Sequence, residues 1–173
     1  LDADPSEARS TCWLGVFALH SRWSGGRTPG MQGYLDNALA EARAVGSAAA
    51  ESRALLFDGV FHSFIDLDPY GSAGERLRRA EQVAATAGLV ADRVSAVHAR
   101  AVLAAHCSRY ELARELLLDA RQLLTSSPRP AGDVLMLPAC PVATSRRLGA
   151  PWLVWEETFM PHLTTSARSE GAY

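Results

Sequence analysis

The sequence is poor in residues that mark several large classes of protein. It contains no lysine, so all 17 basic residues are arginine, and it has three cysteines among 173 residues. Three scattered thiols do not form a disulfide framework and are typical of a reducing cytosol. A phosphate-binding loop of the Walker type requires a lysine, so that motif is excluded. From the few, scattered cysteines we expect a cytoplasmic protein.

The sequence also lacks long apolar runs and a strong excess of one charge. No run approaches the roughly 18–20 apolar residues that span a bilayer. The formal net charge of −2 does not indicate a nucleic acid or an acidic membrane as partner. The chain begins at Leu1 and its first methionine is Met31, so we expect it to be a piece of a longer protein.

The clearest pattern that is present predicts a helical hairpin near residues 91–124. Its second helix begins near Tyr110 and carries an apolar stripe at helical spacing, namely Leu112, Leu116, Leu117, Ala120, Leu123 and Leu124. The helix before it, about Ala91–Cys107, is rich in alanine and is expected to bury Val94, Val97, Ala101 and Ala104 or Ala105. Small residues allow close helix packing. Ser108–Arg109 is a connection of the length expected between antiparallel helices.

Four more helices are predicted upstream, at about 4–22, 31–45, 47–66 and 73–88. Glycines are expected to end the second and fourth of them, at Gly46 and Gly88. The heaviest aromatic cluster, where we place the core, lies in the third helix at Leu56, Phe57, Val60, Phe61, Phe64 and Ile65. The predicted fold class is therefore all-α.

An internal repeat joins these helices. Five pairs of residues recur at a separation of 42, namely Ala38/Ala80, Ala42/Ala84, Gly46/Gly88, Ala49/Ala91 and Ala54/Ala96. A matched helix pair that recurs after several tens of residues predicts hairpins stacked as an α-solenoid. The separation exceeds the roughly 34 residues of a tetratricopeptide unit. We expect about three pairs over residues 1–126.

The repeated pattern A-x3-A-x3-G-x2-A-x4-A, followed by R-Y-E-L-A-R-E-L-L-L-D-A, resembles the tetratricopeptide-like arrays of large bacterial regulators. LuxR-type regulators of the MalT-like kind and related STAND ATPases are the most similar group. The resemblance covers roughly Met31–Ser126. It implies a bacterial protein with a role in signal transduction and transcription regulation, whose helical array is flanked by a nucleotide-binding module and a DNA-binding module.

Residues 127–173 are expected to cap the array within the same domain. Pro128, Pro130, Pro138 and Pro141 predict a loop. A short helix around Trp152 and Trp155 is predicted to follow it. These two tryptophans, with Arg76 and Arg79, are the candidate residues of a groove for a partner or ligand. Tryptophans in such a position more commonly form a hydrophobic cap. Arginines spaced in this way more commonly lie on a solvated helix face.

A second set of residues would suit a metal. Asp58, His62 and Asp66 are spaced four residues apart and so share one helix ridge. Carboxylate and imidazole groups bind zinc, manganese and iron. A known metal site draws its ligands from several elements. The simpler interpretation is that Asp58 and Asp66 are solvated and that His62 pairs with one of them.

The cysteines favour a structural role. His106 and Cys107 are adjacent on a helix, so their side chains point about 100° apart, which does not suit a nucleophile pair. We expect Cys107, and equally Cys12 and Cys140, to be small buried thiols.

The sequence therefore predicts a non-enzymatic module, without a cofactor, that binds a protein, a peptide or a small effector. It predicts no direct contact with nucleic acid or membrane, and possible self-association through uncapped helices. The alternative is a metal-dependent helical enzyme or ligand-binding bundle centred on Asp58, His62 and Asp66.

Overall fold

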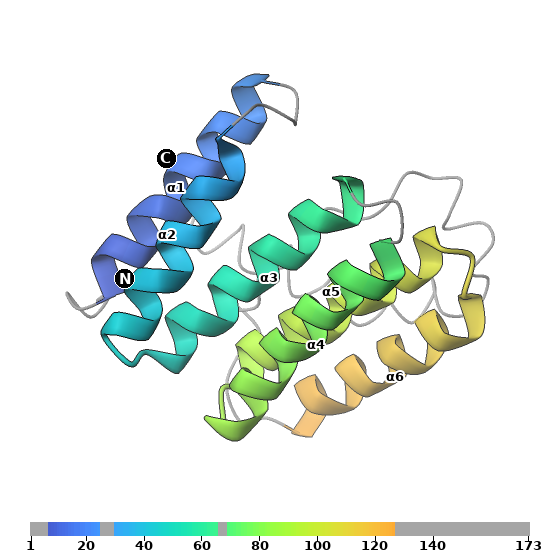
Figure 1. Cartoon of the computed structure of the whole chain (residues 1–173). Helices are drawn as coiled ribbons and strands as arrows, with labels where there is room; N and C mark the ends of the chain where they lie inside the picture. The colour runs from blue at the N-terminus through green and yellow to red at the C-terminus, as the bar shows by residue number, and fades with distance from the viewer. Residues whose placement is uncertain (1–6, 25–29, 66–68, 127–173) are drawn as a thin grey trace, which may run out of the picture. The chain divides into compact units, whose positions relative to one another are not determined.

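The computed structural model describes residues 7–24, 30–65 and 69–126, and within these ranges all regular structure is helical. Six helices follow one another along this part of the chain, labelled in Figure 1. They are α1 (Ala8–Ser24), α2 (Met31–Ala44), α3 (Ala48–Ile65), α4 (Pro69–Thr86), α5 (Val90–His106) and α6 (Tyr110–Ser126). The all-α prediction is confirmed for the described residues. None of these helices combines the length and the apolar character that crossing a membrane would need.

The chain divides into two compact units, with the boundary between Leu89 and Val90. In the first unit α1 packs against α2 and α3 against α4, so that two helical hairpins form, and α2 also packs against α3. In the second unit α5 packs against α6, which is the hairpin predicted for residues 91–124 (Figure 1).

Left-handed residues end three of the helices. Gly46 after α2 and Gly88 after α4 have φ angles of 69° and 68°, and Ser108 after α5 has a φ angle of 59°. In each case the next amide donates to the carbonyl five residues earlier, in the bonds Ser47–Ala42, Leu89–Ala84 and Arg109–Ala104, at 3.1, 2.9 and 2.8 Å. This hydrogen bond at a helix C-terminus requires a left-handed residue, for which glycine is best suited. The predicted terminal glycines Gly46 and Gly88 take that place.

The start of α4 differs from the prediction. The sequence Pro69–Tyr70–Gly71 suggested a break before a helix at residue 73, but α4 already begins at Pro69. Proline is tolerated in the first turn because the amide it lacks would have no partner within the helix. The proline therefore begins this helix.

In both hairpins of the first unit, a serine of the first helix bonds to the second helix. Ser10 Oγ on α1 donates to the carbonyl of Ala38 on α2 at 2.8 Å. Ser52 Oγ on α3 donates to the carbonyl of Ala80 on α4 at 3.0 Å. Both serines are 1% exposed, and both bonds join residues 28 apart. The 42-residue repeat thus begins in α1, upstream of the matched alanines.

The second helices of the hairpins share a buried stripe. Each has a leucine followed three residues later by an alanine, and all of these are buried, namely Leu35 and Ala38, Leu77 and Ala80, and Leu117 and Ala120. Alanine at the contact lets the paired helix approach closely. The hairpin of α5 and α6 therefore buries a leucine–alanine pair in its second helix, as the first two hairpins do.

Helix α3 is buried on two sides. One side carries Ser52 and Gly59 and faces α4, where a Cβ on Gly59 would lie 2.6 Å from Leu77 Cδ2. The other side packs against a core cluster built from Leu14 and Phe17 of α1, Met31, Leu35 and Ala38 of α2, and Ala54 of α3 itself.

The core is centred differently from the prediction. The aromatic residues of α3 were expected to form it, but Phe57 and Phe61 are only half-buried and pack on the edge of the cluster. Both make edge-to-face contacts with Phe17, with ring centroids 6.2 and 5.5 Å apart. The side chains of Phe64 and Ile65 lie outside the described residues. Residues of α1 and α2 therefore contribute more of the core than the pattern in α3 indicated.

Candidate functional site

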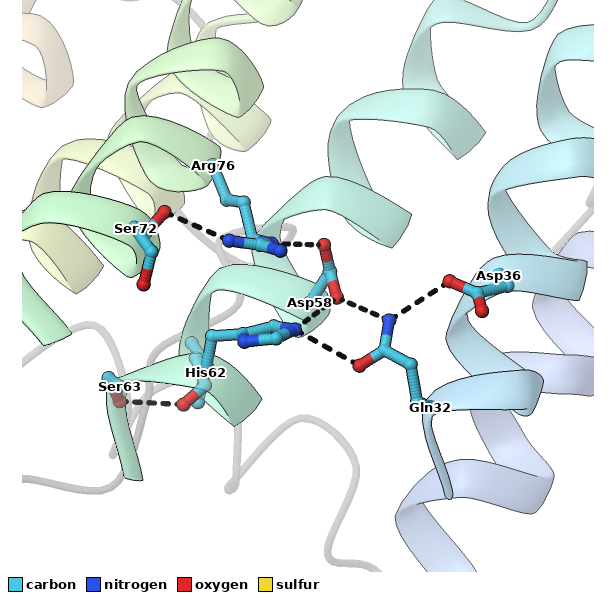
Figure 2. A network of polar contacts seen from close by, with 8 residues as sticks. Gln32, Asp36, Asp58, His62, Ser63, Ser72 and Arg76 are labelled. Atoms are coloured by element: carbon cyan, nitrogen blue, oxygen red, sulfur yellow. Dashed lines mark hydrogen bonds and ion pairs between the residues drawn. The ribbon is translucent and has the colours of Figure 1, made fainter. Parts of the chain in front are cut away.

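A cluster of polar side chains connects three helices of the first unit (Figure 2). Asp58 of α3 lies at its centre and is 9% exposed. Arg76 Nε of α4 donates to Asp58 Oδ2 at 2.8 Å, and Gln32 Nε2 of α2 donates to Asp58 Oδ1 at 3.0 Å. The carboxylate thus receives a charged donor from one side and a neutral donor from the other. We call Gln32, Asp36, Asp58, His62 and Arg76 the three-helix cluster.

The amide of Gln32 sets the hydrogen-bond direction within the cluster. Its Nε2 donates both to Asp58 and, at 2.9 Å, to Asp36 Oδ1, so its Oε1 is left to accept. His62 Nε2 lies 3.1 Å from that oxygen and must therefore carry a hydrogen. The same nitrogen is 3.5 Å from Asp58 Oδ1. Gln32 thus connects α2 to both polar residues of α3.

Arg76 is held in place from two sides. Its Nη1 donates to the carbonyl of Ser72 one turn earlier at 3.2 Å, while its Nε holds Asp58. About a third of its side chain is still exposed. An arginine positioned in this way presents donors to solvent in a fixed orientation.

The structure brings together some of the predicted site residues. Asp58 and His62 lie side by side, as the simpler interpretation of their spacing predicted, but Asp58 is buried between helices and not solvated as expected. Asp66 lies outside the described residues. Within the described ranges, no group of three or more histidine, cysteine, aspartate and glutamate residues could hold a metal ion. The positively charged partner of the Asp58 carboxylate is the guanidinium of Arg76 and not a metal ion.

The candidate groove residues are placed only in part. Arg76 is half-buried and Arg79, three residues further along α4, is exposed. Trp152 and Trp155 lie outside the described residues. Gln32, which the sequence analysis did not single out, is the residue that extends the cluster to α2. Its own sequence context gives no signal for this, because the contact joins residues 26 apart.

The first hairpin has a related polar contact at the equivalent position. His20 of α1 precedes His62 by 42 residues, and Tyr34 of α2 precedes Arg76 by 42. His20 Nδ1 lies 3.4 Å from Tyr34 Oη. The Tyr34 ring also stacks on Trp13, with centroids 6.0 Å apart. The repeat thus places a histidine at the same position of the first helix in both hairpins of the first unit, and extending the alignment to α1 would have found it.

The thiols and the remaining histidines are not members of the three-helix cluster. His98 of α5 is 1% exposed, and burial lowers its pKa from 6.5 to about 4. Burial also lowers the pKa of His106. Cys107 is partly buried, but Cys12 is exposed, so the prediction of a buried thiol is wrong there. The reason is that Cys12 lies on the side of α1 that faces solvent.

Comparison with known proteins does not add a family. No family model, no curated protein and no solved structure matches this chain. The resemblance to regulator arrays therefore stays a prediction, and the three-helix cluster is interpreted from its own geometry.

Replacing Arg76 by alanine is expected to lower the free energy of unfolding by about 1–2 kcal/mol, because the mostly buried carboxylate of Asp58 then loses its charged partner. The partial exposure of Arg76 keeps the loss below that of a fully buried pair. Chemical denaturation followed by circular dichroism measures it. Arg79→Ala, on the same helix but exposed, is the matched control and should change stability by less than about 0.5 kcal/mol. Equal effects of the two substitutions would contradict the assigned role of Arg76.

Proposed function

We propose that this chain is a non-enzymatic interaction module of a larger bacterial regulator, and that the three-helix cluster is the surface that receives a protein or peptide segment. The observation that carries the proposal is the cluster itself. It displays half-buried donors and acceptors from α2, α3 and α4 at one place, among them Gln32, His62 and Arg76. An extended peptide offers the backbone groups and side chains that such a surface can bind.

The repeated hairpins support the same function. Ser10 and Ser52 make the same buried bond in successive hairpins, so the first unit contains two copies of one structural unit. Repeats of this kind, when stacked as a tetratricopeptide-like solenoid, form extended binding surfaces. The regulatory role itself rests on the resemblance of residues 31–126 to regulator arrays and is a fold-level analogy.

The charges on α4 indicate which peptides should bind. Arg79 is exposed one turn beyond Arg76, so this edge of the cluster carries positive charge that Asp58 does not neutralise. A carboxylate of the partner would bind there, because arginine pairs with carboxylates in a bidentate manner. We therefore expect peptides with at least one aspartate or glutamate to be preferred, and their binding to weaken as salt is added.

Selection from a random peptide library displayed on phage tests this function. We expect enriched peptides that contain an acidic residue, and Arg79→Ala is expected to weaken their binding about tenfold, which corresponds to about 1.4 kcal/mol. The control is Arg121→Ala, an exposed arginine on α6 outside the cluster, which should leave affinity unchanged. Failure to enrich any peptide, or equal sensitivity to both substitutions, would argue against the proposal.

The metal-dependent alternative is less well supported. Arg76 donates to Asp58 at 2.8 Å, so a divalent cation that used this carboxylate would first have to displace a guanidinium. A rise in melting temperature with zinc or manganese that His62→Ala abolishes would favour the alternative.

A further inference from the structure

The guanidinium of Arg76 has donors that the three-helix cluster does not use. Its Nε donates to Asp58 Oδ2 and its Nη1 to the carbonyl of Ser72, and Figure 2 shows the planar group lying between these two residues. Within the described residues no hydrogen bond uses its Nη2, and this nitrogen is in reach of solvent. A guanidinium carries five N–H donors in one plane. One donor on Nη1 and one on Nη2 point in the same direction, and together they can receive the two oxygens of a carboxylate.

Asp58 fixes the direction of these donors. Its own carboxylate is held in place, because Gln32 Nε2 donates to Oδ1 at 3.0 Å while Oδ2 accepts from Arg76 Nε at 2.8 Å. Asp58 is 9% exposed, whereas about a third of the Arg76 side chain remains exposed. A free arginine side chain loses rotamer freedom when a partner binds it, which weakens the binding. In Arg76 much of that freedom is already lost before a partner arrives.

The internal repeat shows that a hairpin of this chain forms without such an ion pair. The positions 42 residues before and after Asp58 and Arg76 hold other combinations of residues, namely Val16 with Tyr34, and Arg100 with Leu118. The first helix nevertheless packs against the second in all three hairpins. An ion pair that is mostly buried is often no more stabilising than apolar residues in its place. The pair of Asp58 and Arg76 is therefore available for a task other than holding α3 and α4 together.

We propose that Asp58 is a positioning residue, which holds Arg76 so that its Nη1 and Nη2 together bind one carboxylate of the partner. This inference rests on the proposed function and names the group that a bound peptide must offer. The carboxylate belongs either to an acidic side chain or to the C-terminus of the peptide, since both present the same two oxygens. The negative charge of Asp58 also repels this carboxylate, but the guanidinium of Arg76 lies between the two. The positioning effect is therefore the larger one.

The test is isothermal titration calorimetry with an acidic peptide enriched in the phage selection. The peptide is made with a free and with an amidated C-terminus, and with each acidic side chain replaced by its amide, so that the series shows which carboxylate is bound. Arg76→Lys is expected to weaken binding of the acid form at least about tenfold, because lysine keeps the charge but lacks the parallel pair of donors. Arg121→Lys, at an exposed arginine of α6, is the matched control and should leave the affinity unchanged.

Asp58→Asn tests the positioning role itself. We expect it to weaken binding of the acid form about tenfold and to lower the preference for acid over amide, whereas loss of a repelling charge alone would tighten binding. Misfolding would instead weaken acid and amide forms alike, and circular dichroism detects it.

Two failures can be told apart. Unchanged or tighter binding by Asp58→Asn overturns the positioning role and leaves the interaction module standing. If that variant does not fold, an unchanged affinity of Arg76→Lys overturns it in the same way. A parent chain that binds no peptide overturns the proposed function, and this inference with it.

Discussion

Replacing Gly59 by valine is expected to lower the free energy of unfolding by about 3 kcal/mol, the largest effect of any single substitution considered. A Cβ at this position would lie 2.6 Å from Leu77 Cδ2, 2.7 Å from its Cγ and 3.2 Å from its backbone nitrogen. Leu77 is 1% exposed and has no room to move away, so α3 and α4 would have to separate. Chemical denaturation followed by circular dichroism measures the loss.

The control for Gly59 is Gly33 in α2. It is also a helical glycine, but a Cβ there meets nothing within 4 Å. Gly33→Ala should therefore stabilise the protein by about 0.5–1 kcal/mol, because alanine has the higher helix propensity. If Gly59→Val did not lower the free energy of unfolding, that result would contradict the close contact between α3 and α4 described at this position.

Replacing His98 by leucine is expected to make the stability of the protein much less sensitive to acid. His98 follows Leu14 and Leu56 at the repeat interval, and like them it is buried. Burial lowers its pKa from 6.5 to about 4, so the unfolded chain binds a proton in this interval that the folded chain does not. The stability that the protein gains from keeping His98 neutral is therefore fully present above pH 6.5 and is lost as the pH falls towards 4. The free energy of unfolding should fall by about 2 kcal/mol between pH 7 and pH 5 for this reason.

Urea denaturation at pH 7 and pH 5 measures this effect. At pH 7 the leucine variant should match the parent within about 1 kcal/mol. At pH 5 it should be the more stable of the two. The pKa of His106 is lowered too, so a smaller dependence in the same direction will remain and should disappear in a further His106→Gln substitution. A leucine variant as acid-sensitive as the parent would contradict the assignment.

Much of the helical architecture could be predicted from local pattern. Apolar stripes and the terminal glycines Gly46 and Gly88 are short-range signals, and the helices they predicted begin and end within a few residues of those observed. The connection at Ser108 was predicted from length alone. Pro69 misled the prediction, because the same residue can precede a helix or begin one.

The candidate site was predictable only where its residues share one helix. Asp58 and His62 are four residues apart, and helix geometry alone brings them together. Gln32 and Arg76 reach Asp58 from other helices, at separations of 26 and 18 residues, so only the packing of the hairpins reveals the contacts. Cys12 was predicted wrongly for a related reason, since the sequence does not show which side of α1 is covered.

The proposed role of the three-helix cluster as a binding surface can be tested residue by residue in solution. Amide chemical shifts of the isotope-labelled chain would be recorded while the best selected peptide is added. We predict that the shifts which change belong to residues around Gln32, Asp58, His62 and Arg76 of α2, α3 and α4. Changes confined to α6, or a peptide that leaves the cluster unaffected, would contradict the claim.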